Sequence, residues 1–133
     1  MSFDIMLQRF HDGQSVTFSR KLVDEIFDPF VVHRDPAFIR VRYPDQSGAD
    51  IWLGADEEEI SGIMFNHCGG EQFADAFFEL LKRTGSVIYW PGGGCVVADP
   101  DIGKELPSSM TEALGAPITV HSGREIFECT IQS

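Results

Sequence analysis

The chain has 133 residues, of which 43% are hydrophobic, and it carries a formal net charge of −11 at pH 7. This length and composition are those of one folded domain, residues 1–133, which can form a core without a metal or disulfides. The negative charge argues against nucleic-acid binding through phosphate contacts and against association with anionic membrane surfaces.

The first residues, MSFDIMLQRF, contain charged residues and no long apolar run, and no later stretch approaches the length of a membrane span. The three cysteines, Cys68, Cys95 and Cys129, are widely spaced and odd in number, which favours reduced thiols over a disulfide framework. We therefore expect a cytoplasmic protein.

In chain order, the pattern of apolar residues predicts a strand at 2–10, a turn at HDGQS and a helix at about 17–28 that stops at Pro29. Alternation then predicts a hairpin of strands at 38–43 and 49–53. An acidic connection follows at 55–59, and a strand is expected at 60–67.

The second helix is the clearest element, because Phe73, Phe77 and Leu80 share one face and Gly85 is placed to end it. The remaining predictions are strands at 86–90 and 95–99, a helical turn capped by Asp99, a helix with a capping box of Ser109 and Glu112, and strands at 117–121 and 125–131.

These elements predict an α+β fold: one mostly antiparallel sheet of about five to seven strands, with two main helices packed on one face. The order strand, helix, hairpin occurs twice, which also fits a tandem βαββ arrangement. Ile5-Met6-Leu7-Gln8 and Ile63-Met64-Phe65-Asn66 open the two units with similar sequences.

The segments FDIMLQRFHDG, GIMFNH and WPGGGCVVADP resemble those of small uncharacterised bacterial cytosolic proteins. The resemblance implies a bacterial cytosolic setting and brings no activity, cofactor or site residue with it.

His67 and Cys68 stand just before the second helix, where the helix dipole lowers the pKa of a thiol. Neighbouring strand residues point to opposite faces, so His67 is poorly placed to act as the base, and His11 and His121 are alternatives. The structural interpretation is a strand end that leads into a turn.

Glycine-rich PGGGC could lie beside Gly69-Gly70, so that His67, Cys68, Trp90 and Cys95 line a pocket. No close pair of metal ligands is present, so we expect neither a metal nor a cofactor.

Acidic residues are concentrated between residues 43 and 81, a segment without Lys or Arg. Glu71, Asp75 and Glu79 recur every four residues opposite the core face of the second helix, with Phe78 at the edge of this acidic stripe. The alternatives are an ordinary solvated face and an interface for a basic protein. The candidate partner-binding residues are Asp56, Glu57, Glu58, Glu59, Glu71, Asp75, Phe78 and Glu79.

Two hypotheses follow. The first is a non-enzymatic binding module that docks a basic protein, as immunity proteins and nuclease inhibitors do. The second is a small enzyme or ligand-binding protein that uses Cys68 and the glycine-rich loops. The sequence favours the first, without an enzymatic activity.

Overall fold

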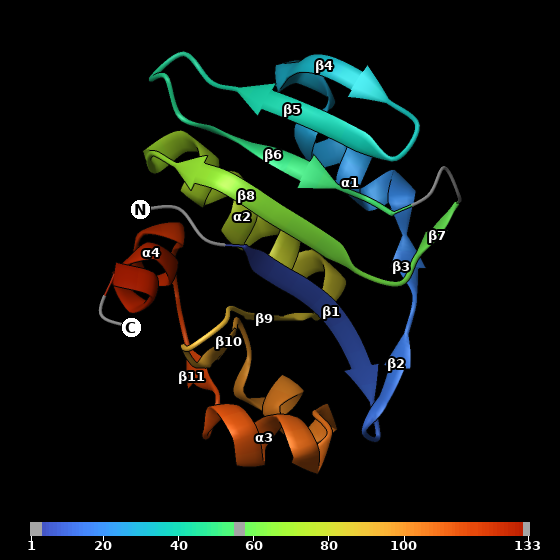
Figure 1. Cartoon of the computed structure of the whole chain (residues 1–133), viewed down its shortest axis with the longest axis vertical. Coiled ribbons are helices and arrows are strands. Elements are labelled where there is room, and N and C mark those ends of the chain that lie inside the picture. The colour runs from blue at the N-terminus through green and yellow to red at the C-terminus, as the bar shows by residue number, and fades with distance from the viewer. Residues whose placement is uncertain (1–3, 55–57, 132–133) are drawn as a thin grey trace.

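The computed structural model describes residues 4–54 and 58–131, which form a single α+β domain built on one large, mostly antiparallel sheet (Figure 1). The nine strands of this sheet run in the order β11-β10-β9-β1-β8-β6-β5-β4, with β2 paired to β1. Only β10 and β11 pair in parallel among the described strands. The sheet therefore matches the predicted class and has more strands than the five to seven expected.

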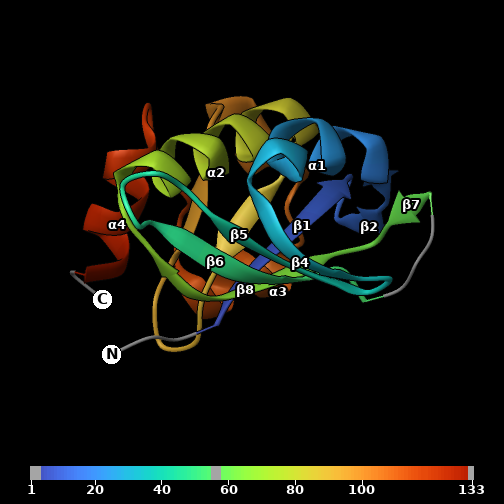
Figure 2. The same ribbon diagram turned by 90° about the horizontal axis from the view of Figure 1, so that it is seen from above.

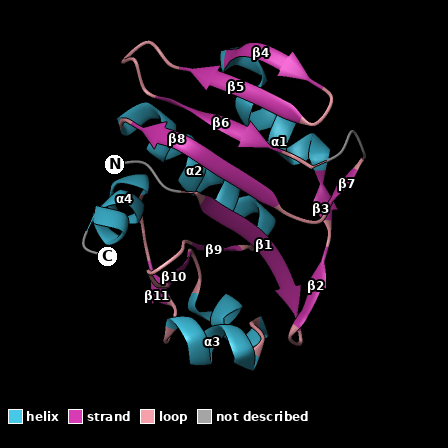
Figure 3. Ribbon diagram, in the orientation of Figure 1, coloured by secondary structure: helices cyan, strands magenta, loops and turns pink. Residues whose placement is uncertain are grey.

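The strands of the large sheet are β1 Ile5–His11, β2 Gln14–Val16, β4 Val31–Asp35, β5 Phe38–Arg42, β6 Gly48–Trp52, β8 Ile63–Gly69, β9 Val87–Tyr89, β10 Cys95–Val97 and β11 Ile118–Thr119. A separate pair is formed by β3 Phe18–Ser19 and β7 Glu59–Ile60. The helices are α1 Arg20–Phe27, α2 Glu71–Thr84, α3 Ser108–Leu114 and α4 Gly123–Ile131, with 3-10 helices η1 Asp28–Phe30 and η2 Pro100–Glu105 (Figure 3).

Both main helices, α1 and α2, lie on one face of the sheet, as predicted (Figure 2). The core between them and the sheet is rich in phenylalanine: Phe27, Phe65, Phe73 and Phe77 are completely buried. The ring centroids of Phe65 and Phe77 are 4.5 Å apart. Alternating residues of β5, β6 and β8 supply the sheet side of this core, so the residues between them point to the opposite face.

That opposite face is covered only at one end. Ile88 and Val96 belong to the main core, whereas their neighbours Val87 and Val97 pack with Leu106 in a second, smaller core. Because successive strand residues point to opposite sides, η2 and α3 lie on the face away from α1 and α2. Over β5, β6 and β8, no described helix covers this face (Figure 1).

The two similar segments that suggested a repeat form β1 and β8, which pair antiparallel at the centre of the sheet. Ile5 lies opposite Phe65 and Leu7 opposite Ile63, so the shared pattern reflects two strands buried on the same face. The strands that follow each helix are added differently: β4, β5 and β6 run from the edge inward, whereas β9, β10 and β11 run outward.

The prediction of a strand at 125–131 is wrong, because these residues belong to α4. Ile126 and Thr130 are buried one helical turn apart, and Phe127 packs with its ring 6.3 Å from that of Phe73. The helix begins with a capping arrangement in which the Glu125 N–H donates to Ser122 Oγ and the His121 N–H donates to the Glu125 carboxylate.

Other predicted helix ends had mixed outcomes. Gly85 ends α2 in the left-handed conformation, and Asp99 accepts a hydrogen bond from the Asp101 N–H at the start of η2, both as predicted. The capping box of Ser109 and Glu112 is wrong, because α3 begins at Ser108 without a side-chain cap. The first helix begins at Arg20, later than expected, because Phe18 and Ser19 form β3.

Candidate functional site

His67 lies in a β-bulge of β8, where the pairing of this strand with β6 shifts register. Asp50 pairs with Asn66 and Gly48 with Gly69, so one residue of β6 faces two of β8 at this point. His67 has a φ of 53°, an uncommon conformation for a residue other than glycine. A bulge redirects side chains, so the strict alternation expected for this strand end does not apply.

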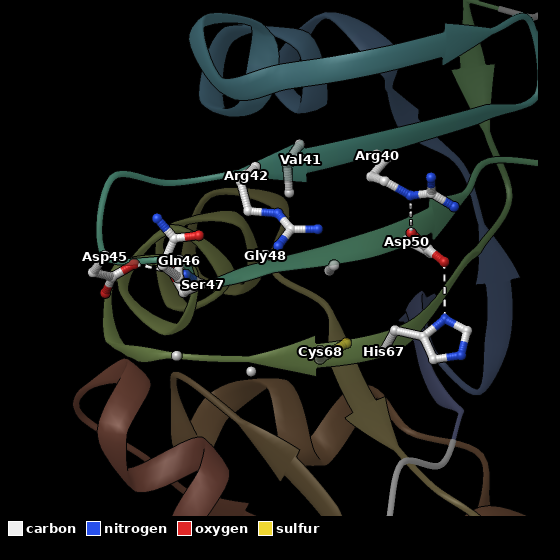
Figure 4. Close-up of a pocket in the computed structure, with 13 residues that line it drawn as sticks. Arg40, Val41, Arg42, Asp45, Gln46, Ser47, Gly48, Asp50, His67 and Cys68 are labelled. Atoms are coloured by element: carbon white, nitrogen blue, oxygen red, sulfur yellow. Dashed lines mark hydrogen bonds and ion pairs between the residues drawn. The ribbon is translucent and has the colours of Figure 1, made fainter.

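Asp50 joins the side chains of three neighbouring strands on the uncovered face of the sheet (Figure 4). Its Oδ1 accepts a hydrogen bond from Arg40 Nε at 2.7 Å, and its Oδ2 lies 2.8 Å from His67 Nδ1. Asp50 is 9% exposed, whereas the His67 side chain is 69% exposed. Arg40, Asp50 and His67 therefore form a row in which the buried Asp50 carboxylate bonds an exposed guanidinium on one side and an exposed imidazole on the other.

The pKa of Asp50 reflects opposing effects. Burial alone would raise it, but the hydrogen bonds and charges of Arg40 and His67 outweigh burial and lower the pKa below its ordinary value. Asp50 is therefore a carboxylate at neutral pH, and a carboxylate that accepts from His67 Nδ1 leaves Nε2 of this ring turned to solvent.

This row borders an open depression of about 270 Å³, which we call the sheet hollow. It is lined by residues 40–42, 45–50 and 67–70. Arg42 pairs with Gly48 on β6, and Gly48 pairs with Gly69 on β8. Because two of these three residues have no side chain, the pairing leaves bare backbone between Arg42 and the bulge, and this absence of side chains opens the hollow.

The loop between β5 and β6 closes one end of the sheet hollow and caps α2. Asp45 accepts a hydrogen bond from the Gln72 N–H and Ser47 Oγ accepts one from the Phe73 N–H, each at 3.0 Å. Gly70, with a φ of 96°, fits closely here, because a Cβ on it would lie 1.9 Å from Ser47 Cβ. Two of the N–H groups at the start of α2 are therefore bonded within the protein.

Cys68 does not have the surroundings of an activated thiol. It packs against the main core, and burial, followed by the charges of Asp50 and Asp4, raises its pKa to about 12. Burial also raises the pKa of Cys95 and Cys129. These cysteines are therefore protonated at neutral pH, contrary to the effect expected from the helix dipole.

The histidines considered as alternative bases lie elsewhere. His121 follows β11, which is separated from β8 by three strands of the sheet. His11 lies at the end of β1 away from the bulge, where its Nδ1 is 3.0 Å from a carboxylate oxygen of Glu105. The sheet thus brings His67 and Cys68 next to Asp50, and it brings neither of the other two histidines there.

The predicted pocket between the two glycine-rich turns is not formed. The loop at 91–94 joins β9 and β10, which are separated from β8 by β1. Trp90 is buried and borders a different groove, beside Met110 and Leu114 of α3, and Cys95 is completely buried. Of the two glycine-rich turns, Gly69-Gly70 lines the sheet hollow and the loop at 91–94 does not.

The acidic face of α2, formed by Glu71, Asp75 and Glu79, lies opposite the buried side of the helix. Glu71 and Asp75 are exposed, and no cation of the described residues pairs with them. Glu79 is 3.4 Å from Lys82 Nζ. Phe78 is half-buried against the core, and Lys82 lies over its ring at 5.6 Å.

The remaining acidic candidates lie near β7. Glu58 is exposed, and its carbonyl accepts a hydrogen bond from the Arg20 N–H. Glu59 accepts a hydrogen bond from Thr17 Oγ1 at 3.1 Å and borders a hollow that also contains Lys82, at the end of α2 away from Glu71. Asp56 and Glu57 lie outside the described residues.

The sequence interpretation did not single out Arg40, Arg42 or Asp50. Two signals were present: the arginines alternate with Val41, which places both on one strand face, and Asp50 interrupts the apolar strand ADIWL. A charged residue in the middle of a buried strand requires a partner, and the arginines of the preceding strand were the nearest candidates.

Comparison with known protein families, curated proteins and solved structures finds no match to this chain. Over residues 4–54 and 58–131, no helix combines the length and the apolar character needed to cross a membrane. In the same part of the chain, no group of three or more His, Cys, Asp or Glu residues is arranged to hold a metal ion.

Proposed function

We propose that the protein is a non-enzymatic binding module that docks a basic protein partner through the acidic face of α2. The observation that carries this proposal is the pair Glu71 and Asp75, which are exposed and have no cationic partner among the described residues. Like charges one turn apart destabilise a helix by about 0.2 to 0.5 kcal/mol, so the repulsion between these two carboxylates opposes the helix. A basic partner would remove that cost.

The net charge of −11 supports the same function. A strongly negative surface attracts a positively charged partner over a distance, which increases the association rate and makes it decrease with salt. Phe78 adds an aromatic ring at the edge of the acidic face, and its ring is partly accessible beneath Lys82. Aromatic rings next to charged residues are frequent at protein interfaces.

The alternative of an enzyme that uses Cys68 has less support, since a thiol with a pKa of about 12 is almost entirely protonated at neutral pH. Nor does a described histidine other than His67 line the sheet hollow beside it.

The docking proposal is tested by capture from bacterial lysate at low and high salt. The test variant carries Glu71→Lys, Asp75→Lys and Glu79→Lys together. The control variant carries Asp101→Lys, Glu112→Lys and Glu128→Lys, which make the same change in net charge at exposed positions outside α2. We expect the wild type and the control to retain a basic protein at low salt and the test variant to lose it. Equal recovery by all three proteins would refute the docking surface.

A further inference from the structure

Arg42 is the feature of the sheet hollow that the packing of the protein does not explain. Its side chain is exposed on β5 and extends toward β6 near Gly48 (Figure 4). Among the described residues, no carboxylate forms an ion pair with it and no acceptor takes a hydrogen bond from it. Arg40, two residues away on the same strand, is bonded to Asp50.

The charges around Arg42 leave it uncompensated. Arg40 and Arg42 point to the same face of β5 and lie roughly 7 Å apart along the strand, where like charges repel. Two acids line the sheet hollow, and both are already engaged: Asp50 with Arg40 and His67, and Asp45 with the N–H groups of Ser47 and Gln72. The positive charge of Arg42 therefore remains without a counterion from the lining.

The shape of the sheet hollow leaves room for a counterion beside Arg42. Gly48 and Gly69 provide a floor of bare backbone, and a Cβ on Gly48 would lie 2.2 Å from the Val41 carbonyl oxygen, so the β6 position requires glycine. The volume of the sheet hollow, about 270 Å³, lies just below the range of about 300 to 1,000 Å³ that is usual for ligand pockets. It suits a small metabolite better than a large cofactor.

We propose that the sheet hollow binds a small oxyanion, the carboxylate or phosphate group of a small metabolite, through the guanidinium of Arg42. A guanidinium presents a planar fork of N–H donors that matches two oxygens of such a group. Asp50 positions Arg40 and His67 as the adjoining wall and compensates the charge of Arg40. This site is separate from the acidic face of α2, so the oxyanion proposal can be tested independently of the proposed partner docking.

Titration followed by amide and arginine NMR resonances tests this site. Inorganic phosphate and succinate are added separately to the wild type, which distinguishes phosphate from carboxylate recognition. We expect saturable shifts confined to residues 40–42, 48 and 67–70 with at least one of the two probes. Arg42→Gln should weaken the binding by at least about tenfold, because it removes hydrogen bonds to a charged group.

Two further variants make the result specific. Arg124→Gln removes the same charge from an exposed position on α4 and should bind as the wild type does. Arg42→Lys keeps the charge without the fork and should bind between the wild type and Arg42→Gln. Spectra of the variants without ligand report whether each is folded. Shifts that do not saturate with either probe, or equal affinities in Arg42→Gln and the wild type, would overturn the proposal.

Discussion

Asp50 carries a buried charge that the fold tolerates because of its two partners, Arg40 and His67. A buried carboxylate is tolerated when hydrogen bonds and opposite charges replace water, and Arg40 and His67 do so here. Asp50→Asn removes the charge that compensates Arg40. We expect the variant to lose about 1 to 3 kcal/mol of unfolding free energy at pH 7, measured by urea denaturation.

The pH dependence of this loss follows from the lowered pKa of Asp50. A group whose pKa is lower in the folded protein stabilises it above the unfolded value of about 3.9, and this stabilisation disappears as the pH falls through the folded pKa. The difference between wild type and Asp50→Asn should therefore begin to shrink as the pH approaches the unfolded value of about 3.9 and should continue to shrink below it, as the pH falls through the lower folded pKa. Asp101→Asn, at an exposed position, should show little difference at any pH; a constant difference for Asp50→Asn would contradict this account.

The three cysteines should be slow to react in the folded protein. The pKa of Cys68 is about 12, so its thiolate is scarce at neutral pH. We expect iodoacetamide labelling of Cys68, followed by peptide mass spectrometry, to keep rising with pH beyond pH 9. In urea, all three should titrate near the ordinary value of about 8.5. A labelling rate of Cys68 that reaches its plateau below pH 8 in the folded protein would instead support an activated thiol.

The sequence placed His67 and Cys68 at a strand end before a glycine turn, and this local prediction is confirmed. Their chemical surroundings could not be predicted in the same way. The helix dipole is a local effect that the sequence reveals, whereas the burial of Cys68 and the bond from His67 to Asp50 depend on which strands lie side by side. The bulge that redirects His67 exists only in the pairing with β6.

At the scale of elements, α2 depends on a loop from another part of the chain. The helix follows Gly70, which has no side chain to cap it. Instead, Ser47 Oγ, from the loop between β5 and β6, accepts a hydrogen bond from the Phe73 N–H. Ser47 is 4% exposed, so its removal would leave a buried N–H without a partner. We expect Ser47→Ala to cost about 1 to 2 kcal/mol of unfolding free energy, measured by urea denaturation.

Ser109→Ala is the matched control. Ser109 is exposed on α3 and no side-chain hydrogen bond caps that helix, although the sequence predicted one. The substitution should change stability by no more than about 0.5 kcal/mol. Equal losses for Ser47→Ala and Ser109→Ala would mean that the loop does not stabilise α2.

The region of α4 explains why one element was predicted wrongly. Phe127, Cys129 and Ile131 alternate as in a strand, but Ser122 and Glu125 have the spacing of a capping box. The structure follows the second signal, because α4 has to bury Ile126 and Phe127 against α2. A short apolar segment can fit both the two-residue period of a strand and the 3.6-residue period of a helix, and its packing against the rest of the fold determines which one forms.

For the whole molecule, composition and periodicity were sufficient for the class but not for the order of strands. An α+β domain with both main helices on one face follows from amphipathic patterns alone. The position of β1 between β8 and β9 does not, since its partners come from sequence far beyond the first helix. The sheet hollow depends on another long-range pairing, that of β6 with β8, which brings His67 and Gly69 beside Asp50 and Gly48, and this pairing could not be predicted from local patterns.

This strand order predicts that the domain unfolds as one unit, although the sequences of β1 and β8 are similar and suggested two repeats. The central strand β1 pairs on both sides with later strands, so neither end of the sheet is complete alone. Trp52 on β6 and Trp90 after β9 report on the two ends, and each can be isolated by Trp90→Phe or Trp52→Phe. In each variant, we expect urea denaturation followed by tryptophan fluorescence and by far-ultraviolet circular dichroism to give coincident transitions. Fluorescence midpoints that depart from circular dichroism in either variant would show that the two ends of the sheet unfold separately, as independent repeats would.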